Sequence, residues 1–264
     1  MSRGEGFARH SLFQIMNNYQ QKFAIVFLFL LLTHLNADAA SKAPECVVLL
    51  HGLARSEKSL LKLERYLENK KFCVVNIGYP SREKTIQELS VEVIPKAIEQ
   101  CRTLNASKIH FITHSMGGIL VRYYLEQNEV AKLGRVVMLS PPNSGSEVVD
   151  KLKDNRIFKW LNGPAGEQLG TDPDSLPNTL GSPNYEVGII TGDKTINPIL
   201  SLLIPGKDDG KVSVESAKLH GMKDFLIVHR SHPFIMNDEK VLQQIIAFIK
   251  NGMFSRDKHT EPSD

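Results

Sequence analysis

The sequence predicts an α/β fold with a mostly parallel central sheet, helices on both faces and one irregular insertion. Short apolar runs that stop at glycine or proline alternate with segments in which apolar residues recur at helical spacing. The apolar runs show no polar alternation, which is typical of strands buried on both faces of a parallel sheet. With 264 residues, 42% of them hydrophobic, the chain is long enough for one well-buried core.

The first part of the domain supplies four strands separated by three helices. The expected strands are residues 45–52, 71–80, 108–113 and 134–142, and the expected helices are residues 56–69, 85–101 and 117–128. Strands and helices that alternate at these lengths form right-handed βαβ units on a parallel sheet. Pro95 falls inside the second helix, and since proline lacks the amide hydrogen of a helical bond, we expect a kink or a division there.

After the fourth strand, the apolar residues no longer recur at helix or strand spacing. Residues 141–184 are rich in Gly, Pro, Asn and Ser, and we interpret them as a cap-like or lid-like insertion. The regular elements that follow are strands at 185–192 and 224–230 and an amphipathic helix at 240–254. Asn237 is the expected N-cap of that helix. The last residues, 256–264, form a polar tail.

The N-terminus has the pattern of a secretory signal. Lys22 precedes an unbroken apolar run at residues 23–32, and Ala37 and Ala39 supply the small residues that signal peptidase reads. The run is shorter than the roughly 20 apolar residues of a membrane-spanning helix. We therefore expect cleavage after Ala39.

Cleavage divides the chain into residues 1–39, a signal peptide that starts at Met1 or Met16, and residues 40–264, a secreted or periplasmic domain. The three cysteines all remain in that domain: Cys46, Cys73 and Cys101. An oxidising destination permits one disulfide and leaves an odd thiol. From the sequence, the pairing stays open, as does burial of all three as small apolar side chains.

Composition argues against several classes of site. The formal net charge is +3 and no basic run occurs, so we expect no nucleic-acid partner. The cysteines and histidines lack metal-ligand spacing such as C-x-x-C or H-E-x-x-H, so we assign no metal, and ligands for a structural calcium cannot be placed. Gly117 and Gly118 lack the lysine of a phosphate-binding loop, and we expect no cofactor.

The most informative segment is KIHFITHSMGGILVRYYL at residues 108–125, where a strand ends on Ser115 and a helix begins at once. In an open parallel sheet, chemistry occurs beyond the carboxyl ends of the strands. A sharp strand-to-helix turn exposes the serine oxygen there, and Gly117 lets the backbones approach closely. The helix start also offers the N–H of Met116 to a developing oxyanion.

Residues 113–117, Thr-His-Ser-Met-Gly, and residues 51–53, His-Gly-Leu, resemble the motifs of α/β-hydrolase serine lipases and esterases of the secreted bacterial type. The resemblance covers residues 45–250 and implies an α/β-hydrolase fold. In that family the residue after His-Gly supplies the second oxyanion N–H, which by position is Leu53 here. Thr113 departs from the family pattern, which has glycine two residues before the serine.

A serine hydroxyl needs a histidine base, which a carboxylate holds in turn. Among the nine histidines, position leaves His220, His229 and His232. His229 still belongs to the last expected strand, whereas His232 falls in the loop before the final helix, from which a side chain reaches over the sheet edge. We assign His232 as the base and keep His229 as the alternative.

The acid should lie between the serine and the histidine in the chain. Residues 206–217, GKDDGKVSVESA, resemble the lipase segment in which Asp-Gly is followed by an apolar residue, and this resemblance implies Asp209 as the acid. Gly210 would let the backbone turn so that the carboxylate faces the imidazole. Asp208 and Asp193 remain alternatives.

Two apolar segments are expected to overhang the serine, one in the insertion and one at residues 197–206. Their candidate substrate-binding side chains are Phe158, Trp160, Leu202 and Leu203. Apolar surface of this kind favours an acyl chain over a sugar or a charged peptide, and it lets a lid open at a lipid surface. The alternative interpretation is that these residues only cover the core.

The sequence therefore predicts a secreted serine ester hydrolase of lipase or esterase type, which acts through an acyl-enzyme on small-molecule or lipid esters and contacts lipid surfaces transiently. Ser115 attacks, His232 moves the proton, Asp209 holds His232, and the N–H groups of Leu53 and Met116 bind the oxyanion. The alternatives are acyl transfer by the same three residues and a non-catalytic binding protein on a hydrolase scaffold. The sequence makes no prediction of the oligomeric state.

Overall fold

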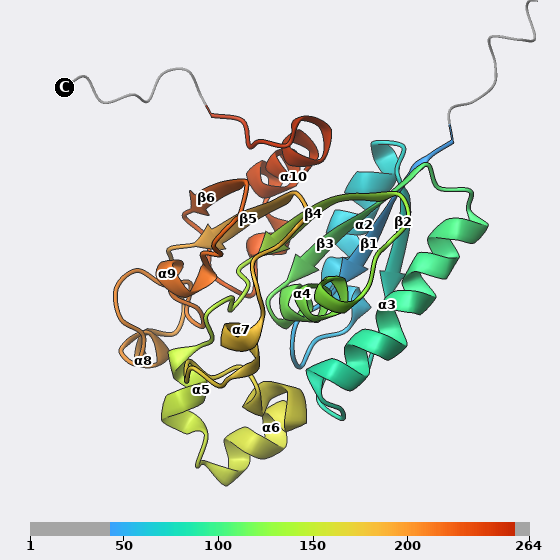
Figure 1. The fold of residues 1–264 in the computed structure, drawn as a ribbon. Helices are drawn as coiled ribbons and strands as arrows, with labels where there is room; N and C mark the ends of the chain where they lie inside the picture. Colours follow the sequence, from blue (N-terminus) through green and yellow to red (C-terminus); the bar gives the residue numbers. More distant parts are fainter. Residues whose placement is uncertain (1–42, 257–264) are drawn as a thin grey trace, which may run out of the picture. The chain divides into compact units, whose positions relative to one another are not determined.

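The computed structural model describes residues 43–256 (Figure 1), so the predicted signal peptide and the end of the polar tail lie outside the described residues. A six-stranded sheet has the order β2-β1-β3-β4-β5-β6. Its strands are β1 (Glu45–Leu50), β2 (Cys73–Ile77), β3 (Lys108–His114), β4 (Leu133–Leu139), β5 (Val187–Gly192) and β6 (Asp224–Val228). Every neighbouring pair is parallel, which confirms the predicted sheet.

Side chains of β1 alternate between two apolar layers. Cys46, Val48 and Leu50 belong to one core cluster, and Val47 and Leu49 belong to the other. All five are fully buried. Because both faces of the strand are covered, neither face needs polar side chains, and this explains the unbroken apolar run in the sequence.

Helices cover both faces of the sheet (Figure 1). One layer contains α3 (Ile86–Thr103) and α4 (Met116–Gln127), whose buried side chains join the first core cluster. The other layer contains α2 (Leu61–Asn69) and α10 (Glu239–Asn251), which join the second cluster. None of the helices within residues 43–256 is both long and apolar enough to cross a membrane.

The chain leaves the neighbouring strands β1 and β3 in opposite directions. After β1 it passes to α2 in one layer, whereas after the adjacent β3 it passes to α4 in the other. Segments that leave neighbouring strands towards opposite faces open a crevice beyond the carboxyl ends of the strands. Residues 51–53 and Ser115, which follow these two strands, therefore lie at this crevice.

Pro95 does not divide α3, which runs from Ile86 to Thr103 without a break. Of the kink or division that the sequence predicts, the division is wrong. Thr85 and Glu88 form a capping box at the start of the helix, and buried side chains lie on both sides of the proline. The cap and this burial offset the roughly 3 kcal/mol that proline costs in a helix interior.

The N-cap of α10 is Asp238, so the assignment of Asn237 is wrong by one residue. The Asp238 carboxylate accepts hydrogen bonds from the N–H groups of Lys240 and Val241. Asn237 instead ends a short 3-10 helix, η2 (Ile235–Asn237). A carboxylate at this position also interacts favourably with the positive end of the helix dipole.

Residues 141–184 are more regular than the sequence suggested. They contain α5 (Glu147–Leu152), α6 (Arg156–Glu167) and α7 (Leu176–Thr179). Gly163 has a φ of 63° inside α6, so the helix is split into two short pieces. Pieces of this length show too few turns to reveal a helical period. Other short helices are η1 (Glu57–Leu60), α8 (Pro198–Ser201) and α9 (Val214–Ala217).

One disulfide joins the first two strands. Cys46 and Cys73 face each other in the parallel register of β1 and β2 and are bonded. Cys101 is a free thiol buried in α3. The pairing that the sequence left open is therefore Cys46 with Cys73.

Candidate active site

Ser115 occupies the sharp turn between β3 and α4. Its backbone has a φ of 53° and a ψ of −125°, a conformation that residues other than glycine rarely adopt. The Ser115 N–H donates to the carbonyl of Leu139 in β4 (2.8 Å), and the Ser115 carbonyl accepts from the N–H of Gly118 (2.9 Å). Backbone strain of this kind persists only where the surroundings enforce it, and it concentrates at functional sites.

Two glycines let this turn press against the end of β1. A β-carbon on Gly117 would lie 2.7 Å from the carbonyl oxygen of Leu50. A β-carbon on Gly52 would lie 2.9 Å from Nδ1 of His114 and 3.1 Å from Cβ of Ser115. The distances of 2.7 and 2.9 Å are too short for real contacts, so only glycine permits the backbone of the His-Gly-Leu segment to pass directly against Ser115.

This close approach brings Leu53 beside the serine turn. Leu53 follows Gly52 directly, and Met116 is the first residue of α4. Among residues 43–256, no acceptor is paired with the N–H of Leu53 or with that of Met116. These two N–H groups are therefore available for the oxyanion role that the sequence assigns to them.

His51 supports the Leu53 segment and is fixed by Tyr79. The two rings stack with their centroids 3.9 Å apart. The Tyr79 N–H donates to Nε2 of His51 (3.3 Å), so Nδ1 carries the proton and donates to the carbonyl of Gly52 (2.9 Å). The Tyr79 hydroxyl also donates to the His51 carbonyl. Burial lowers the pKa of His51, which keeps this ring neutral.

His232 and Asp209 form a buried pair. Nδ1 of His232 donates a 2.8 Å hydrogen bond to Oδ2 of Asp209, and the His232 N–H donates to the Asp209 carbonyl (2.9 Å). The two side chains are 5% and 0% exposed. Since Nδ1 carries a proton, Nε2 is the basic nitrogen, which is the tautomer that a general base requires.

The Asp209 carboxylate is held in its ionised form. Burial acts to raise its pKa, but the charge and the hydrogen bond of His232 outweigh burial, and the pKa lies below its usual value. Oδ1 also accepts hydrogen bonds from the N–H groups of Lys211 (3.1 Å) and Val212 (3.0 Å). Gly210, with a φ of 98°, lets the chain turn back to place these donors.

His114 connects the Asp209–His232 pair to the serine turn. It precedes Ser115, and its Nε2 donates to the carbonyl of His232 (3.0 Å). The His114 and His232 ring centroids are 4.8 Å apart. Burial first, and the charge of His232 second, hold the pKa of His114 well below its usual value. A neutral ring therefore holds the predicted base next to the predicted nucleophile.

The alternative acid and base residues have other partners. The Asp208 carboxylate accepts hydrogen bonds from the N–H of Gly210 (2.7 Å) and the hydroxyl of Ser201 (2.5 Å). His229 and Asp193 contact each other, with Nδ1 and Oδ1 2.9 Å apart, and the His229 side chain is 71% exposed. Asp209 and His232 are thus the candidates that the fold brings against the serine turn.

A buried arginine that the sequence analysis missed anchors α4. Arg122 is 4% exposed and has no carboxylate partner among the described residues. Its Nη1 donates to the carbonyl of Asn143 (2.9 Å) and its Nη2 to the carbonyl of Leu180 (3.0 Å). Burial lowers the pKa of its guanidinium. The helix that begins at the serine turn is therefore tied to the segment after β4.

That segment, PPNSGS at residues 141–146, also reaches the acid loop. Nδ2 of Asn143 donates to the carbonyl of Ala217 (2.9 Å), and the hydroxyl of Ser146 donates to the carbonyl of Lys211 (2.8 Å). The segment therefore joins α4 to the loop that carries Asp209.

The four predicted substrate-binding side chains differ in their surroundings. Trp160 of α6 is 77% exposed and Leu202, which follows α8, is 86% exposed. Phe158 packs partly buried against the core, so the core-covering interpretation holds for this residue. Leu203 and Leu202 line one side of a pocket of about 850 Å³.

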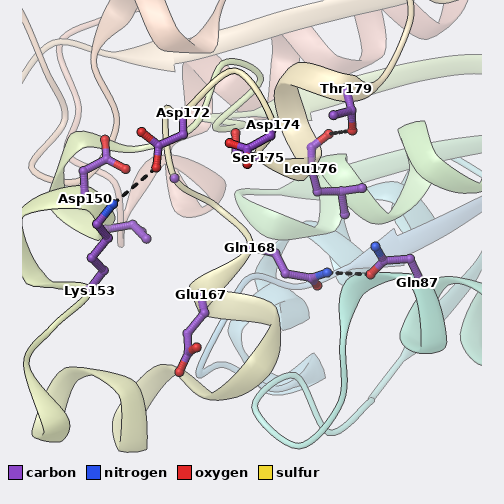
Figure 2. Close-up of a pocket in the computed structure, with 12 residues that line it drawn as sticks. Gln87, Asp150, Lys153, Glu167, Gln168, Asp172, Asp174, Ser175, Leu176 and Thr179 are labelled. Atoms are coloured by element: carbon purple, nitrogen blue, oxygen red, sulfur yellow. Dashed lines mark hydrogen bonds and ion pairs between the residues drawn. The ribbon is translucent and has the colours of Figure 1, made fainter.

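A second pocket, of about 410 Å³, is lined by α3 and by the segment of α5, α6 and α7 (Figure 2). Its wall is polar: Nε2 of Gln168 donates to Gln87 (2.7 Å), and Lys153 pairs with Asp172 (3.3 Å). None of the predicted site residues lines it. Within residues 43–256, no group of three His, Cys, Asp or Glu side chains is arranged to hold a metal ion.

Residues 46–172 match the family model of palmitoyl protein thioesterase. The matched segment is just under half of the chain; it contains Leu53, Ser115 and Met116 and ends before Asp209 and His232. Curated protein sequences give no significant match.

Solved structures share the fold at low sequence identity. Mature lipase BlEst2 of Bacillus licheniformis is 17% identical with a TM-score of 0.63, over 80% of this chain and 93% of the other. Phospholipase PlaB of Legionella pneumophila is 17% identical with a TM-score of 0.58, over 72% of this chain and 53% of the other. The metagenomic carboxyl esterase MGS0156 is 15% identical with a TM-score of 0.56, over 74% and 66%. The sheet order, the serine turn and these neighbours together show that the chain has the α/β-hydrolase fold.

Proposed function

We propose that this chain is a serine ester hydrolase that acts through an acyl-enzyme on carboxylic esters with apolar acyl chains. The proposal rests chiefly on the buried hydrogen bond between Asp209 and His232, which His114 holds against the turn that carries Ser115. A carboxylate that holds an imidazole, next to a strained turn that carries a serine hydroxyl, supplies the groups that acyl transfer needs.

In the proposed mechanism, Nε2 of His232 takes the hydroxyl proton of Ser115 while Oγ attacks the ester carbonyl carbon. The resulting oxyanion accepts hydrogen bonds from the N–H groups of Leu53 and Met116. The imidazolium, stabilised by the ionised Asp209, then gives its proton to the departing alcohol. Water, deprotonated by the same imidazole, attacks the acyl-enzyme, releases the acid and restores Ser115.

The acyl chain would come from a lipid surface through the two exposed apolar segments. On α6, Ile157, Trp160 and Leu161 are exposed together with the basic side chains of Arg156 and Lys159. A helix that exposes apolar and basic side chains together suits an anionic lipid surface. The exposed apolar side chains around α8 are Ile196, Ile199 and Leu202.

A thioester is the second candidate substrate. The match to the palmitoyl protein thioesterase model spans the segment with Leu53 and Ser115, and this favours it. The same steps apply, with a thiol instead of an alcohol as the leaving group. Comparing kcat/KM for a palmitoyl thioester with that for the matched oxygen ester decides between them, because a preference for the thioester well beyond its higher intrinsic reactivity would support the second candidate.

We also propose that the protein is secreted or periplasmic. The disulfide between Cys46 and Cys73 supports this, because such bonds persist in oxidising compartments. Bacterial expression of the full chain, followed by fractionation and mass spectrometry of the N-terminus, tests the proposal. We expect a mature chain that begins near Ala40, and a full-length chain retained in the cytoplasm would contradict it.

Labelling with a fluorophosphonate probe tests the hydrolase proposal. The wild-type protein should be modified at Ser115, and Ser115→Ala should not react. Asp209→Asn should lower kcat by about 10⁴-fold, because His232 is then held in the wrong tautomer. Asp193→Asn, which alters the exposed pair, is the matched control and should keep wild-type turnover. Folded wild-type protein that does not react with the probe would refute the proposal.

The acyl preference can be measured on nitrophenyl esters from acetate to palmitate. We expect turnover to persist beyond butyrate, because α6 and the segment around α8 offer exposed apolar side chains for an acyl chain. Activity confined to butyrate and shorter esters would leave an esterase and remove the lipase interpretation. Addition of butanol separates hydrolysis from acyl transfer, since a butyl ester product in place of the free acid identifies a transferase.

A further inference from the structure

Leu53, the proposed oxyanion donor, is the second residue of a tight turn at residues 52–55. The Arg55 N–H donates to the carbonyl of Gly52 (3.3 Å) and closes the turn. Ala54, the third residue, has a φ of 55°, whereas Leu53 does not have a positive φ. This combination is typical of a type II turn, in which glycine usually occupies the third position. Alanine carries a conformational cost there, so contacts from outside the turn must hold it.

The direction of the Leu53 N–H follows from that of the Gly52 carbonyl. The two groups belong to one planar trans peptide unit and therefore point in opposite directions. Besides the Arg55 N–H, Nδ1 of His51 donates to this carbonyl (2.9 Å). Whatever holds His51 and the turn therefore also sets the direction of the Leu53 N–H.

The segment that follows β2 supplies these contacts. The Tyr79 ring stacks on His51, the Tyr79 N–H donates to Nε2 of that ring (3.3 Å), and the Tyr79 hydroxyl donates to the His51 carbonyl. Two residues later, Oγ of Ser81 accepts a hydrogen bond from the N–H of Ala54 (3.1 Å). This N–H belongs to the central peptide of the turn, whose reversal distinguishes a type II turn from a type I turn. The bond to Ser81 therefore selects the observed turn.

Tyr79 and Ser81 are themselves fixed. They are 8% and 4% exposed. The Ser81 N–H donates to the carbonyl of Tyr79 (2.9 Å), and Pro80 between them has a restricted φ. Near the end of β2, Nδ2 of Asn76 donates to the carbonyl of Glu57, which follows the turn (3.0 Å). The segment after β2 is therefore a rigid support for the turn.

We propose that Ser81 and Tyr79 are positioning residues, which keep the Leu53 N–H directed at the oxyanion. The proposal rests on the hydrolase function above and adds two residues that act through the turn. An oxyanion donor stabilises the transition state more than the bound substrate, so its misalignment lowers kcat and leaves KM nearly unchanged. Loss of a complete donor costs about 10²- to 10³-fold in kcat, and a donor that is present but misaligned should cost less.

The first test measures kcat and KM of Ser81→Ala on nitrophenyl butyrate. We expect kcat to fall about tenfold, with KM within about twofold of the wild-type value. The pH profile of kcat should stay the same, because His232 and Asp209 are untouched. Ser90→Ala is the matched control, since it also removes a buried hydroxyl bond, the one from Oγ of Ser90 to the carbonyl of Leu120 (3.0 Å) between α3 and α4. This control should keep the wild-type kcat.

Ala54→Gly gives a second readout. Glycine accepts a positive φ without cost, so in the Ser81→Ala background it should restore kcat by about threefold or more. Tyr79→Phe keeps the stacked ring but loses the bond to the His51 carbonyl, and it should lower kcat at constant KM. It also tests the proposal independently if Ser81→Ala fails to fold. Melting temperatures show which variants are folded.

The outcomes separate this proposal from the hydrolase proposal. A wild-type kcat in Ser81→Ala and Tyr79→Phe, a loss that Ser90→Ala shares, or a loss that appears in KM would overturn the positioning role while the hydrolase stands. A loss that Ala54→Gly does not reverse would overturn the selection of the turn by Ser81. Lack of turnover by the wild-type protein, together with lack of fluorophosphonate labelling, would overturn both proposals.

Discussion

At the scale of single residues, the backbone of Ser115 carries a conformational cost, because a φ of 53° brings Cβ too close to the backbone. Glycine removes that cost. We therefore expect the free energy of unfolding of Ser115→Gly to be about 1 kcal/mol higher than that of Ser115→Ala. The alanine variant is the control because it also lacks the hydroxyl but keeps the strain. Urea denaturation of the two variants measures the difference. Equal stabilities would mean that the turn is not strained.

Three buried histidines make stability depend on pH. Burial is the main cause that lowers the pKa values of His51, His110 and His114. Below about pH 6.5 the unfolded chain therefore binds protons that the folded chain does not. The free energy of unfolding then decreases as the pH is lowered, by at most about 1.4 kcal/mol per pH unit for each histidine. We expect this decline between pH 6.5 and pH 5 in urea denaturation, and a shallower one for His114→Gln. A wild-type free energy of unfolding that is flat over this range would contradict the prediction.

At the scale of elements, the disulfide between β1 and β2 constrains the edge of the sheet. It closes a loop of 27 residues that contains α2. In the chain-entropy model, a loop of this length contributes about 3.5 kcal/mol. We expect Cys73→Ser to lose about this much stability in urea denaturation. Cys101→Ala serves as the comparison because Cys101 is free, and reduction should leave Cys73→Ser unaffected.

Also at this scale, burial explains which elements the sequence could predict. β1 is apolar from Cys46 to Leu50 because both of its faces are covered, and the elbow at Ser115 has a local signature in its glycines. The sequence did not predict α6, because Gly163 interrupts the helical spacing of its apolar residues. The continuity of α3 across Pro95 depends on packing on both sides of the proline. The partner of Cys46, the Arg122 network and the separate pairing of Asp193 with His229 depend on contacts between distant segments, which local sequence patterns do not contain.

At the scale of the whole molecule, the only tryptophan of the chain reports on the proposed lipid contact. Trp160 is 77% exposed on α6, in the same helix as Arg156 and Lys159. We expect its fluorescence to shift to shorter wavelength on addition of vesicles that contain phosphatidylglycerol, with little shift for pure phosphatidylcholine. Replacing Ile199 and Leu202 by serine should weaken binding without removing the reporter. An unchanged spectrum with both vesicle types would rule out contact through α6.

The position of the proposed base, His232, in the last loop before α10 has a consequence for how the protein matures. Ser115 belongs to the middle of the sheet, whereas His232 follows β6, the edge strand that pairs only with β5. A growing or refolding chain can complete the serine turn long before its proton acceptor arrives. Recovery of turnover after dilution from denaturant should therefore mark the final docking of the C-terminal strand, and not the earlier collapse around β1 and β3.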